Sequence, residues 1–402
     1  MTTPSRTLNQ FDQQQNSQSI DALRGYAILM VIGMHVLGYV PGLVWPVKRL
    51  LLLGANGVQL FFIASAVTLL MSWTRGQGQS LGLRTRRFLI HRFFRIAPLY
   101  FLAIAFYWFF EATPTSEFSL EKLLATVLFY NAWSPYLIPT VGGWKTVPGG
   151  WSISVEFMFY FAFPLLAMTV TTVRRAVLFI VFAYGVLLCA SVYGQHLYPE
   201  ISNEAREHFL FFWPPNQLIV FAIGFLLYQS IKSAAVQAWM RRSRLDANGA
   251  TALFGLSLLF IQFWSKEHFS FLAFLLPQHL MLSILFAGWA LFMILKPGRL
   301  AASGIVVRVG KMSFSIYLIH FAALAVMDAL LTELWPFATT GVASILYAGT
   351  LFAAAALASY HMSRHTYRFI EVPFIRYGKS LHAADQGMLS GMEPLGRDIR
   401  SR

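Results

Sequence analysis

The stretch Ser19–His35, S-I-D-A-L-R-G-Y-A-I-L-M-V-I-G-M-H, is largely apolar and yet contains an arginine and a histidine. Ionisable side chains inside a membrane-spanning segment are costly and are usually kept for a function. Arg24 and His35 are eleven residues apart, which is roughly 16 Å and about three turns of helix, so they share a face. The stretch predicts a membrane helix with an arginine near one surface and a histidine deep on the same stripe.

The composition around this stretch is that of a polytopic membrane protein. The 402 residues are 57% hydrophobic, 16% aromatic and only 12% charged, which is more apolar sequence than a soluble core needs. Segments of about 17 to 25 apolar residues can each cross the hydrocarbon core of a bilayer as a helix. The sequence contains ten such segments, at residues 20–40, 51–74, 96–112, 153–171, 176–194, 209–231, 249–265, 271–295, 313–333 and 340–362. An all-α fold of about ten transmembrane helices is therefore predicted.

One further apolar segment, residues 121–134, is too short and too polar for a membrane crossing. We predict that it lies at the interface or forms a re-entrant segment. The polar residues 1–19 and 379–402 lack apolar periodicity. We therefore predict a disordered N-terminus and a flexible tail on either side of a membrane domain at 20–378.

The net charge of +14 is also typical of nucleic-acid-binding proteins, but the positions of the basic residues argue against that class. With the N-terminus placed inside, 24 of the 31 lysines and arginines fall on cytoplasmic segments and 6 on the opposite loops. This bias is the positive-inside pattern of membrane proteins, and it predicts that both termini are cytoplasmic. Because topology accounts for the basic residues, we expect no nucleic-acid partner.

Cys189 is the only cysteine of the chain, which excludes an intramolecular disulfide and a cysteine-based metal cluster. It lies in an apolar segment and is predicted to be part of the core. The sequence also lacks paired histidines with metal-ligand spacing and a glycine-rich phosphate loop. We therefore expect no metal site.

A carboxylate is predicted to lie at the level of His35. In the stretch P148-G-G-W-S-I-S-V-E156 the fourth span runs inward from Trp151, which places Glu156 about five residues from the outer end, and His35 is at a similar depth in the first span. A carboxylate beside an imidazole fixes its tautomer and raises its basicity, as in a general base that activates a hydroxyl. The alternative is that each residue is isolated and bonded to a neighbouring hydroxyl or backbone carbonyl.

Two arginines, Arg92 and Arg95, lie three residues apart on the helix that leads into the third span and share a face. Arginines at this edge can simply anchor the helix to lipid head groups, which is our interpretation of the others in that segment. Arg92 and Arg95 are better placed to hold phosphates, because guanidinium groups bind them in a forked geometry. Together with Arg24 they are predicted to bind a phosphorylated donor from the cytosol.

His320 lies seven residues into the ninth span, in S313-F-S-I-Y-L-I-H320. Because this span runs outward, we expect His320 in the cytoplasmic third of the bundle and well below His35. A donor group or a helix neighbour is its expected partner. Near the C-terminus Glu371 lies among arginines, where an ion pair that closes the bundle is expected.

Five motifs in these segments resemble, in order, those of the acyltransferase-3 family of integral membrane acyltransferases. They are S-I-D-A-L-R24-G-Y-A with His35 downstream, R92-F-F-R95-I-A-P98, W151-S-I-S-V-E156 followed by Tyr160 and Pro164, S313-F-S-I-Y-L-I-H320, and F369-I-E371-V-P373. They span most of the chain. One motif alone is weakly specific, whereas five in register are strongly specific.

The resemblance implies O-acyl transfer, commonly of an acetyl group, from cytosolic acyl-CoA to a hydroxyl of a cell-envelope glycan, glycolipid or glycoside at the bacterial cytoplasmic (inner) membrane. It implies His35 as the catalytic residue, and Arg92 and Arg95 as residues tied to activity or donor binding. To these we add Glu156 as the partner of His35, and Arg24 and His320 in the donor site. Other motif residues, expected to support the substrate or the structure, are Trp151, Ser152, Ser154 and Tyr317.

Many relatives carry a fused SGNH-type esterase domain, which this chain lacks. The membrane unit is therefore expected to act alone or with a separate periplasmic partner. The sequence leaves open whether the acyl group moves directly to the acceptor or by way of an acyl-histidine.

Two other classes of protein compete with an acyltransferase. A secondary transporter would use intramembrane His, Glu and Arg as a proton or anion path, although related halves with matching broken helices are not evident. A lipid-binding or flippase-like membrane protein would need no chemistry at all. Release of free CoA from acyl-CoA distinguishes the enzyme from both.

Overall fold

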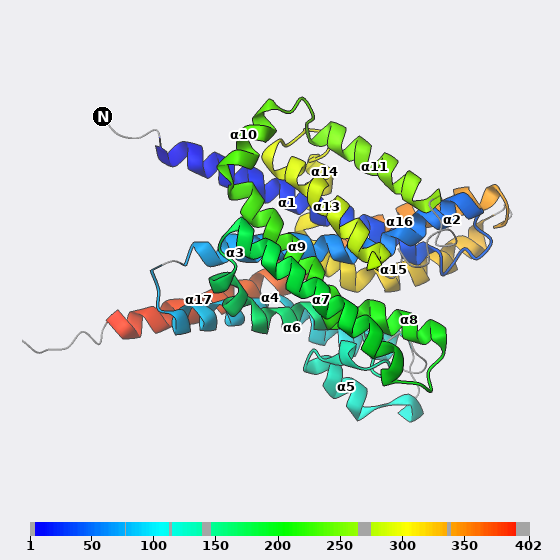
Figure 1. The fold of residues 1–402 in the computed structure, drawn as a ribbon. Coiled ribbons are helices and arrows are strands. Elements are labelled where there is room, and N and C mark those ends of the chain that lie inside the picture. The colour runs from blue at the N-terminus through cyan, green and yellow to red at the C-terminus, as the bar shows by residue number, and fades with distance from the viewer. Residues whose placement is uncertain are drawn as a thin grey trace, which may run out of the picture.

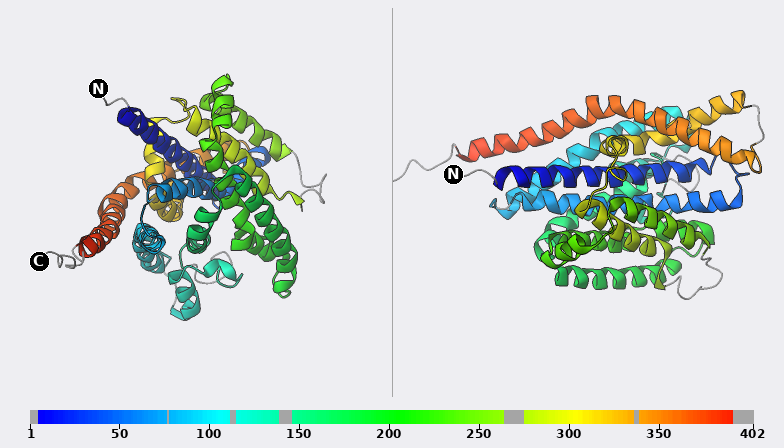
Figure 2. Two further views of the ribbon diagram at one scale, coloured as in Figure 1. Left: turned by 60° about the vertical axis from the view of Figure 1, so that its left-hand side comes forward. Right: turned by 90° about the horizontal axis from the view of Figure 1, so that it is seen from above.

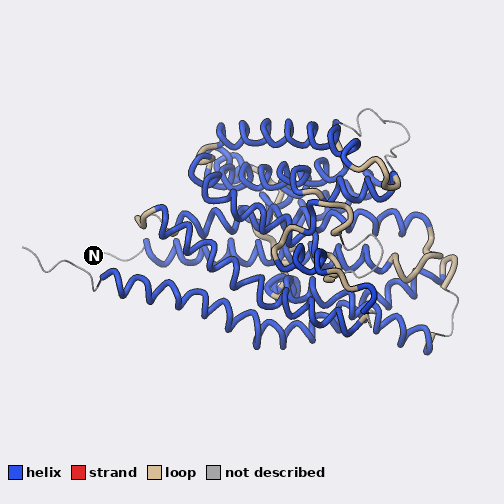
Figure 3. The backbone as a smooth tube through the Cα atoms, turned by 90° about the horizontal axis from the view of Figure 1, so that it is seen from below, coloured by secondary structure: helices blue, strands red, loops and turns tan. Residues whose placement is uncertain are grey.

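The computed structural model describes residues 5–76, 78–111, 115–138, 146–263, 275–335 and 339–390. Within these ranges the secondary structure is helical without strands, and the long helices run side by side as a bundle (Figures 1 and 3). In this part of the chain nine stretches are long and apolar enough to cross a membrane. They are Ser17–Val36, Trp45–Thr74, Leu81–Phe110, Gly150–Thr169, Val173–Leu197, Asn203–Lys232, Gln278–Leu295, Ser313–Leu334 and Ala343–Leu381. The predicted all-α polytopic membrane protein is confirmed.

The tenth predicted crossing corresponds to α11 (Ala247–Phe263), whose 17 residues are at the lower limit for a membrane span. The start of α1 (Ser5–Val36) and the end of α17 (Val372–Ser390) lie at the same end of the bundle (Figure 2). Ten crossings bring a chain back to the side from which it started. The arrangement of the ends therefore agrees with α11 as a crossing helix.

The other helical elements of the described residues form these spans or connect them. They are α2 (Trp45–Leu52), η1 (Leu53–Asn56), α3 (Gly57–Thr74), α4 (Leu81–Phe110), η2 (Thr115–Glu117), α5 (Leu120–Val127), η3 (Asn131–Trp133), α6 (Gly150–Thr169), α7 (Val173–Leu197), α8 (Asn203–Phe212), α9 (Pro214–Lys232), α10 (Ala234–Arg242), α13 (Gln278–Leu295), α14 (Gly304–Lys311), α15 (Ser313–Leu334), α16 (Ala343–Thr366) and the π-helical turn η5 (Tyr367–Glu371).

Residues 115–138 form a short segment, here called the cap segment, that covers the start of α6. Its helix α5 has only eight residues, which confirms that 121–134 is not a membrane crossing. Ser154 of α6 holds the segment, since its hydroxyl donates to the Phe129 carbonyl at 2.6 Å and accepts from the Ala132 N–H at 3.4 Å. The Phe129 ring also stacks on Phe157, with 3.6 Å between the ring centroids. Because of this cover, α6 begins inside the bundle.

Helices α1 and α14 approach each other at two glycines. A Cβ on Gly310 would lie 1.6 Å from the Asp21 carbonyl oxygen, and one on Gly25 would lie 2.3 Å from the Val306 carbonyl oxygen. Only hydrogen at both positions allows the two backbones to touch. This crossing fixes the depth at which α15, which begins two residues after α14, starts its course through the bundle.

Outside the site the structure gives the bounds of the terminal helices and differs from one expectation. Helix α1 begins at Ser5 and α17 continues to Ser390, so helical backbone extends into residues 1–19 and 379–402. The predicted disorder of the N-terminus and flexibility of the tail stay predictions. Extending a helix that the apolar part has already nucleated costs little, because each added residue gains a backbone hydrogen bond. Cys189 is exposed on α7 and not part of the core, since an apolar residue of a membrane helix can face lipid as readily as protein.

Candidate active site

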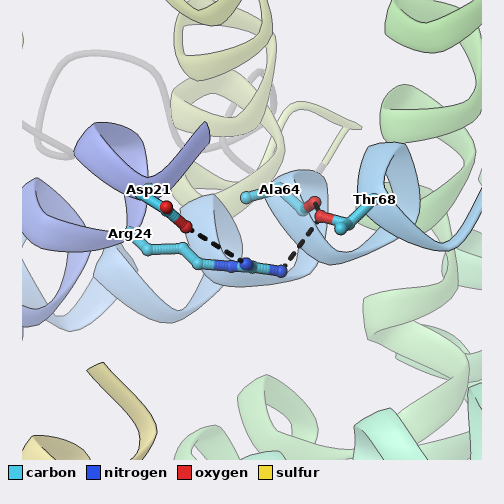
Figure 4. A network of polar contacts seen from close by, with 4 residues as sticks. All are labelled: Asp21, Arg24, Ala64 and Thr68. Atoms are coloured by element: carbon cyan, nitrogen blue, oxygen red, sulfur yellow. Dashed lines mark hydrogen bonds and ion pairs between the residues drawn. The ribbon is translucent and has the colours of Figure 1, made fainter. Parts of the chain in front are cut away.

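Arg24 projects from α1 toward α3 (Figure 4). Its guanidinium donates to the Thr68 hydroxyl at 3.0 Å and lies 3.8 Å from the Asp21 carboxylate (Figure 4). Thr68 in turn donates to the Ala64 carbonyl at 2.5 Å, which fixes the threonine rotamer. The arginine is thus held in one orientation from two sides, and its side chain is only 13% exposed.

Arg92 and Arg95 lie on α4 and line the same cavity as Arg24. The Arg92 guanidinium packs over the Phe88 ring at 5.7 Å and lies within hydrogen-bonding reach of Tyr160. Its buried Nε has no hydrogen-bond partner in the described part of the chain. Arg95 lies in the electrostatic field of both Arg24 and Glu371.

These three arginines line one cavity in the bundle, which encloses about 640 Å³ including its opening. The lining comes from five helices, α1, α3, α4, α6 and α15, and includes Val58, Phe61, Phe62, Ser65, Ile96, Ser152, Ile153, Glu156, Tyr160, Ser313, Phe314 and Tyr317. Three guanidinium groups and a single carboxylate face this space. The cavity therefore favours an anionic ligand.

Glu156 belongs to this arginine cavity and is not beside His35. Its carboxylate accepts a hydrogen bond from Ser65 and interacts with Tyr160, Arg24 and Arg92. The predicted partnership between Glu156 and His35 is thus not found among the described contacts.

His35 lies instead beside His320, at 5.2 Å between ring centroids, and beside Phe321, at 4.4 Å. The expectation that His320 lies well below His35 is therefore wrong. His35 is partly exposed, whereas His320 is fully buried. The Tyr317 ring, 5.6 Å from the ring of His320, also lines the cavity and connects the histidine pair to it.

Both differences from the predicted depths have the same physical cause, since α6 and α15 do not begin at the membrane-surface ends of their apolar segments. Helix α6 begins at Gly150, and a Cβ on Gly149 would lie 2.8 Å from the Tyr317 hydroxyl and 3.1 Å from the Phe321 ring. The first turn of α6 is thus near the level of His35, and Glu156 lies roughly 10 Å further along the helix. The Gly25–Gly310 crossing likewise starts α15 inside the bundle, and seven residues of helix bring His320 to His35.

Gly149 has a φ of 75°, a conformation that glycine adopts readily, and its carbonyl accepts the Tyr317 hydroxyl at 2.9 Å. Ser152 donates to the Tyr317 hydroxyl at 2.8 Å, so Ser152 and Tyr317 join α6 to α15 at the cavity wall. Ser154 and Trp151 do not line the cavity. Ser154 holds the cap segment, and Trp151 packs against Phe212 at 4.4 Å between ring centroids.

Four residues of the site have no role predicted from the sequence, although two of them, Asp21 and Tyr160, lie within the quoted motifs. The other two are Ser65 and Thr68. Each of the four contacts an arginine or Glu156. Asp21 lies three residues before Arg24 and Tyr160 lies four after Glu156, a helical spacing that places each pair on one face. Ser65 and Thr68 gave no such signal, because a hydroxyl within an apolar helix more often bonds its own backbone.

The fold and the site define a polytopic membrane protein with a cavity lined by three arginines and a neighbouring histidine pair. The chain belongs to the acyltransferase-3 family: the family model described as an acyltransferase domain matches residues 17–360. This match confirms the family predicted from the five motifs, and it identifies the protein as a membrane acyltransferase. Comparison with curated proteins and with solved structures gives no match.

Proposed function

We propose that this acyltransferase moves an acyl group, acetyl in the first place, from cytosolic acyl-CoA to a hydroxyl of a cell-envelope glycan or glycoside. The observation that carries the proposal is the cavity in which Arg24, Arg92 and Arg95 meet. The histidine pair lies next to its wall at Tyr317. A phosphorylated donor held by the arginines would extend its pantetheine arm toward this wall.

The lining of the cavity suits the phosphates of a CoA thioester. Guanidinium groups bind phosphate oxygens in pairs, and the buried Nε of Arg92 lacks a partner in the described residues. Glu156 and Tyr160 hold the arginines in place through the contacts described above. We therefore assign Glu156 to the donor end and no longer to the orientation of His35.

His35 is the proposed general base. It removes the proton of the acceptor hydroxyl, the oxygen attacks the thioester carbonyl, the carbon–sulfur bond breaks, and the proton passes to the CoA thiolate. In the two-step alternative the imidazole nitrogen attacks the thioester first and passes the acyl group on. His35 is partly exposed, as either role requires.

The proposed setting is the bacterial cytoplasmic membrane, with the arginines toward the cytosol and the acceptor arriving from the opposite side. The positive-inside bias supports this orientation. The end of the bundle that holds both described chain ends would then be cytoplasmic (Figure 2). A carbohydrate or glycolipid acceptor and a separate periplasmic partner are compatible with it.

Two measurements on matched variants test the proposal. Binding of acetyl-CoA to the purified full-length protein in lipid nanodiscs is compared for wild type, Arg92→Ala and Arg87→Ala, which changes an arginine of the same helix outside the cavity. Loss of a charge-assisted hydrogen bond costs about 1.5–3 kcal/mol, so Arg92→Ala should weaken binding by about 10- to 100-fold. Equal affinities in all three proteins would refute the donor site.

The second measurement is mass spectrometry of cell-surface glycans from cells with and without the gene. Deletion should remove an ester, which wild type restores and His35→Ala does not. His196→Ala, a change at an exposed histidine of α7, should restore the ester fully. An ester restored by His35→Ala would reject His35 as the catalytic residue, and unchanged glycans after deletion would reject the class of acceptor.

A further inference from the structure

Among the described residues, only one of the two ring nitrogens of the fully buried His320 side chain has a hydrogen-bond partner. Its Nδ1 lies 2.7 Å from the Tyr317 carbonyl oxygen. A carbonyl can only accept, so Nδ1 carries the proton and Nε2 is a bare acceptor in the neutral ring. Nε2 is buried and has no hydrogen-bond partner in the described part of the chain. The tautomer of His320 is thereby fixed with its lone pair at Nε2.

An unpaired acceptor in a fully buried position is costly, and such groups normally find a donor. His35 supplies the nearby ring that can donate one, at 5.2 Å between centroids and 44° between planes. Two imidazoles that share a proton between nitrogens about 3 Å apart have centroids about 5 Å apart. A modest rotation of the His35 ring, whose terminal torsion is soft, or one bridging water would complete the contact.

The position of His320 is also fixed by its own helix. The Tyr107 hydroxyl of α4 donates to the Leu318 carbonyl at 2.6 Å, and the Phe321 ring packs against both histidine rings at 4.1 and 4.4 Å. The acceptor atom is thus held rigidly beside a more exposed imidazole. An arrangement of this kind orients one histidine by the other.

We propose that His320 is the positioning residue of His35, accepting its N–H at Nε2 and thereby directing the other His35 nitrogen toward the substrate; this rests on the proposed function. When His35 takes the proton of the acceptor hydroxyl, its second N–H donates to His320 and the imidazolium is stabilised. The hydroxyl oxygen forms the new ester bond, the thioester carbon–sulfur bond breaks, and the proton moves from His35 to the thiolate. In this role His320 would touch neither donor nor acceptor, which replaces its predicted place in the donor site; His320 is not among the residues that line the arginine cavity.

Two substitutions of similar size separate this role from a structural one. His320→Asn keeps a donor to the Tyr317 carbonyl but places nothing at the Nε2 position, whereas His320→Gln can place an amide oxygen there. Acyl transfer from acetyl-CoA is measured for both proteins in nanodiscs, with a glycan extract of the source cells as acceptor. We expect His320→Asn to lower kcat about 100-fold and His320→Gln less than about tenfold. The KM for acetyl-CoA should be unchanged in both.

Which of the two variants has the higher kcat decides whether His320 positions His35 or has only a structural role. A His320→Asn protein as active as His320→Gln, or more active, would overturn the proposal, because the bond to Tyr317 would then be the one that matters. A structure of the wild-type protein in lipid covers the case in which neither variant folds. It should show a His35 nitrogen or a water within hydrogen-bonding distance of Nε2, and an apolar surrounding of Nε2 would contradict the proposal.

Failure of the proposed function gives a different result. Wild-type protein would then transfer no acyl group from acetyl-CoA. If wild type is active and His35→Ala is not, the proposed function stands whatever the order of the His320 variants.

Discussion

Replacing Gly310 by alanine should disable the enzyme from a position that lines no part of the cavity. The new Cβ would lie 1.6 Å from the Asp21 carbonyl oxygen, whereas ordinary contact needs about 3.5 Å. Helices α1 and α14 would have to separate by about 2 Å, since a backbone carbonyl inside a helix cannot turn away. Overpacking of this kind costs about 1–3 kcal/mol.

The larger effect should fall on catalysis. Helix α15 follows α14 directly, so the displacement would pass to His320 and to its contact with His35. A misplacement of about 1 Å in a catalytic arrangement can lower the rate about 100-fold. We therefore expect Gly310→Ala to lower kcat for acyl transfer by about that factor, with a smaller change in the KM for acyl-CoA.

Gly304→Ala is the matched control on the same helix. A Cβ at Gly304 would meet only the Arg308 side chain, at 3.6 Å, so activity and thermal stability should stay within twofold and a few degrees of wild type. Both variants would be assayed by CoA release and by thermal unfolding in nanodiscs. If Gly310→Ala matches wild type in kcat and in melting temperature, the close approach of α1 and α14 does not exist, and the explanation for the depth of His320 fails with it.

Two further predictions concern residues next to the cavity that hold Arg95 and the cap segment in place. Glu371 accepts a hydrogen bond from Ser315 and lies near Arg95. The Glu371→Gln change should therefore raise the KM for acyl-CoA about tenfold with little change in kcat, as measured by steady-state kinetics. A change in kcat alone would contradict a role of Glu371 in holding Arg95. The Ser154→Ala change removes two hydrogen bonds to the cap segment, each of which contributes about 1 kcal/mol to stability. It should make residues 115–138 more sensitive to limited proteolysis. An unchanged digestion pattern would show that other contacts hold the segment.

The membrane fold could be predicted from the sequence because the apolar length of each segment determines whether it crosses the membrane, and the arginines that flank it determine its direction. Nine of the ten predicted spans meet the criteria of length and hydropathy, and α11 is a shorter apolar helix. The arginine cavity could also be predicted, since Arg92 and Arg95 share a helical face. These inferences require only local periodicity and charge.

The relative depths of Glu156, His35 and His320 could not be predicted. They depend on where α6 and α15 begin within the bundle, which the cap segment and the Gly25–Gly310 crossing determine. Both are tertiary contacts between segments far apart in the sequence. Counting residues from the end of an apolar segment assumes that each helix starts at the membrane surface, and neither of these helices does.

The position of Cys189 should allow an introduced cysteine to be labelled without interference from the native thiol. Cys189 is the only thiol of the chain, and it lies on α7 among exposed apolar side chains such as Val192 and Tyr193, a surface that faces hydrocarbon in a bilayer. A charged thiol reagent does not enter hydrocarbon. A cysteine introduced at Ser152 can therefore report on access of aqueous reagents to the cavity without removal of the native residue.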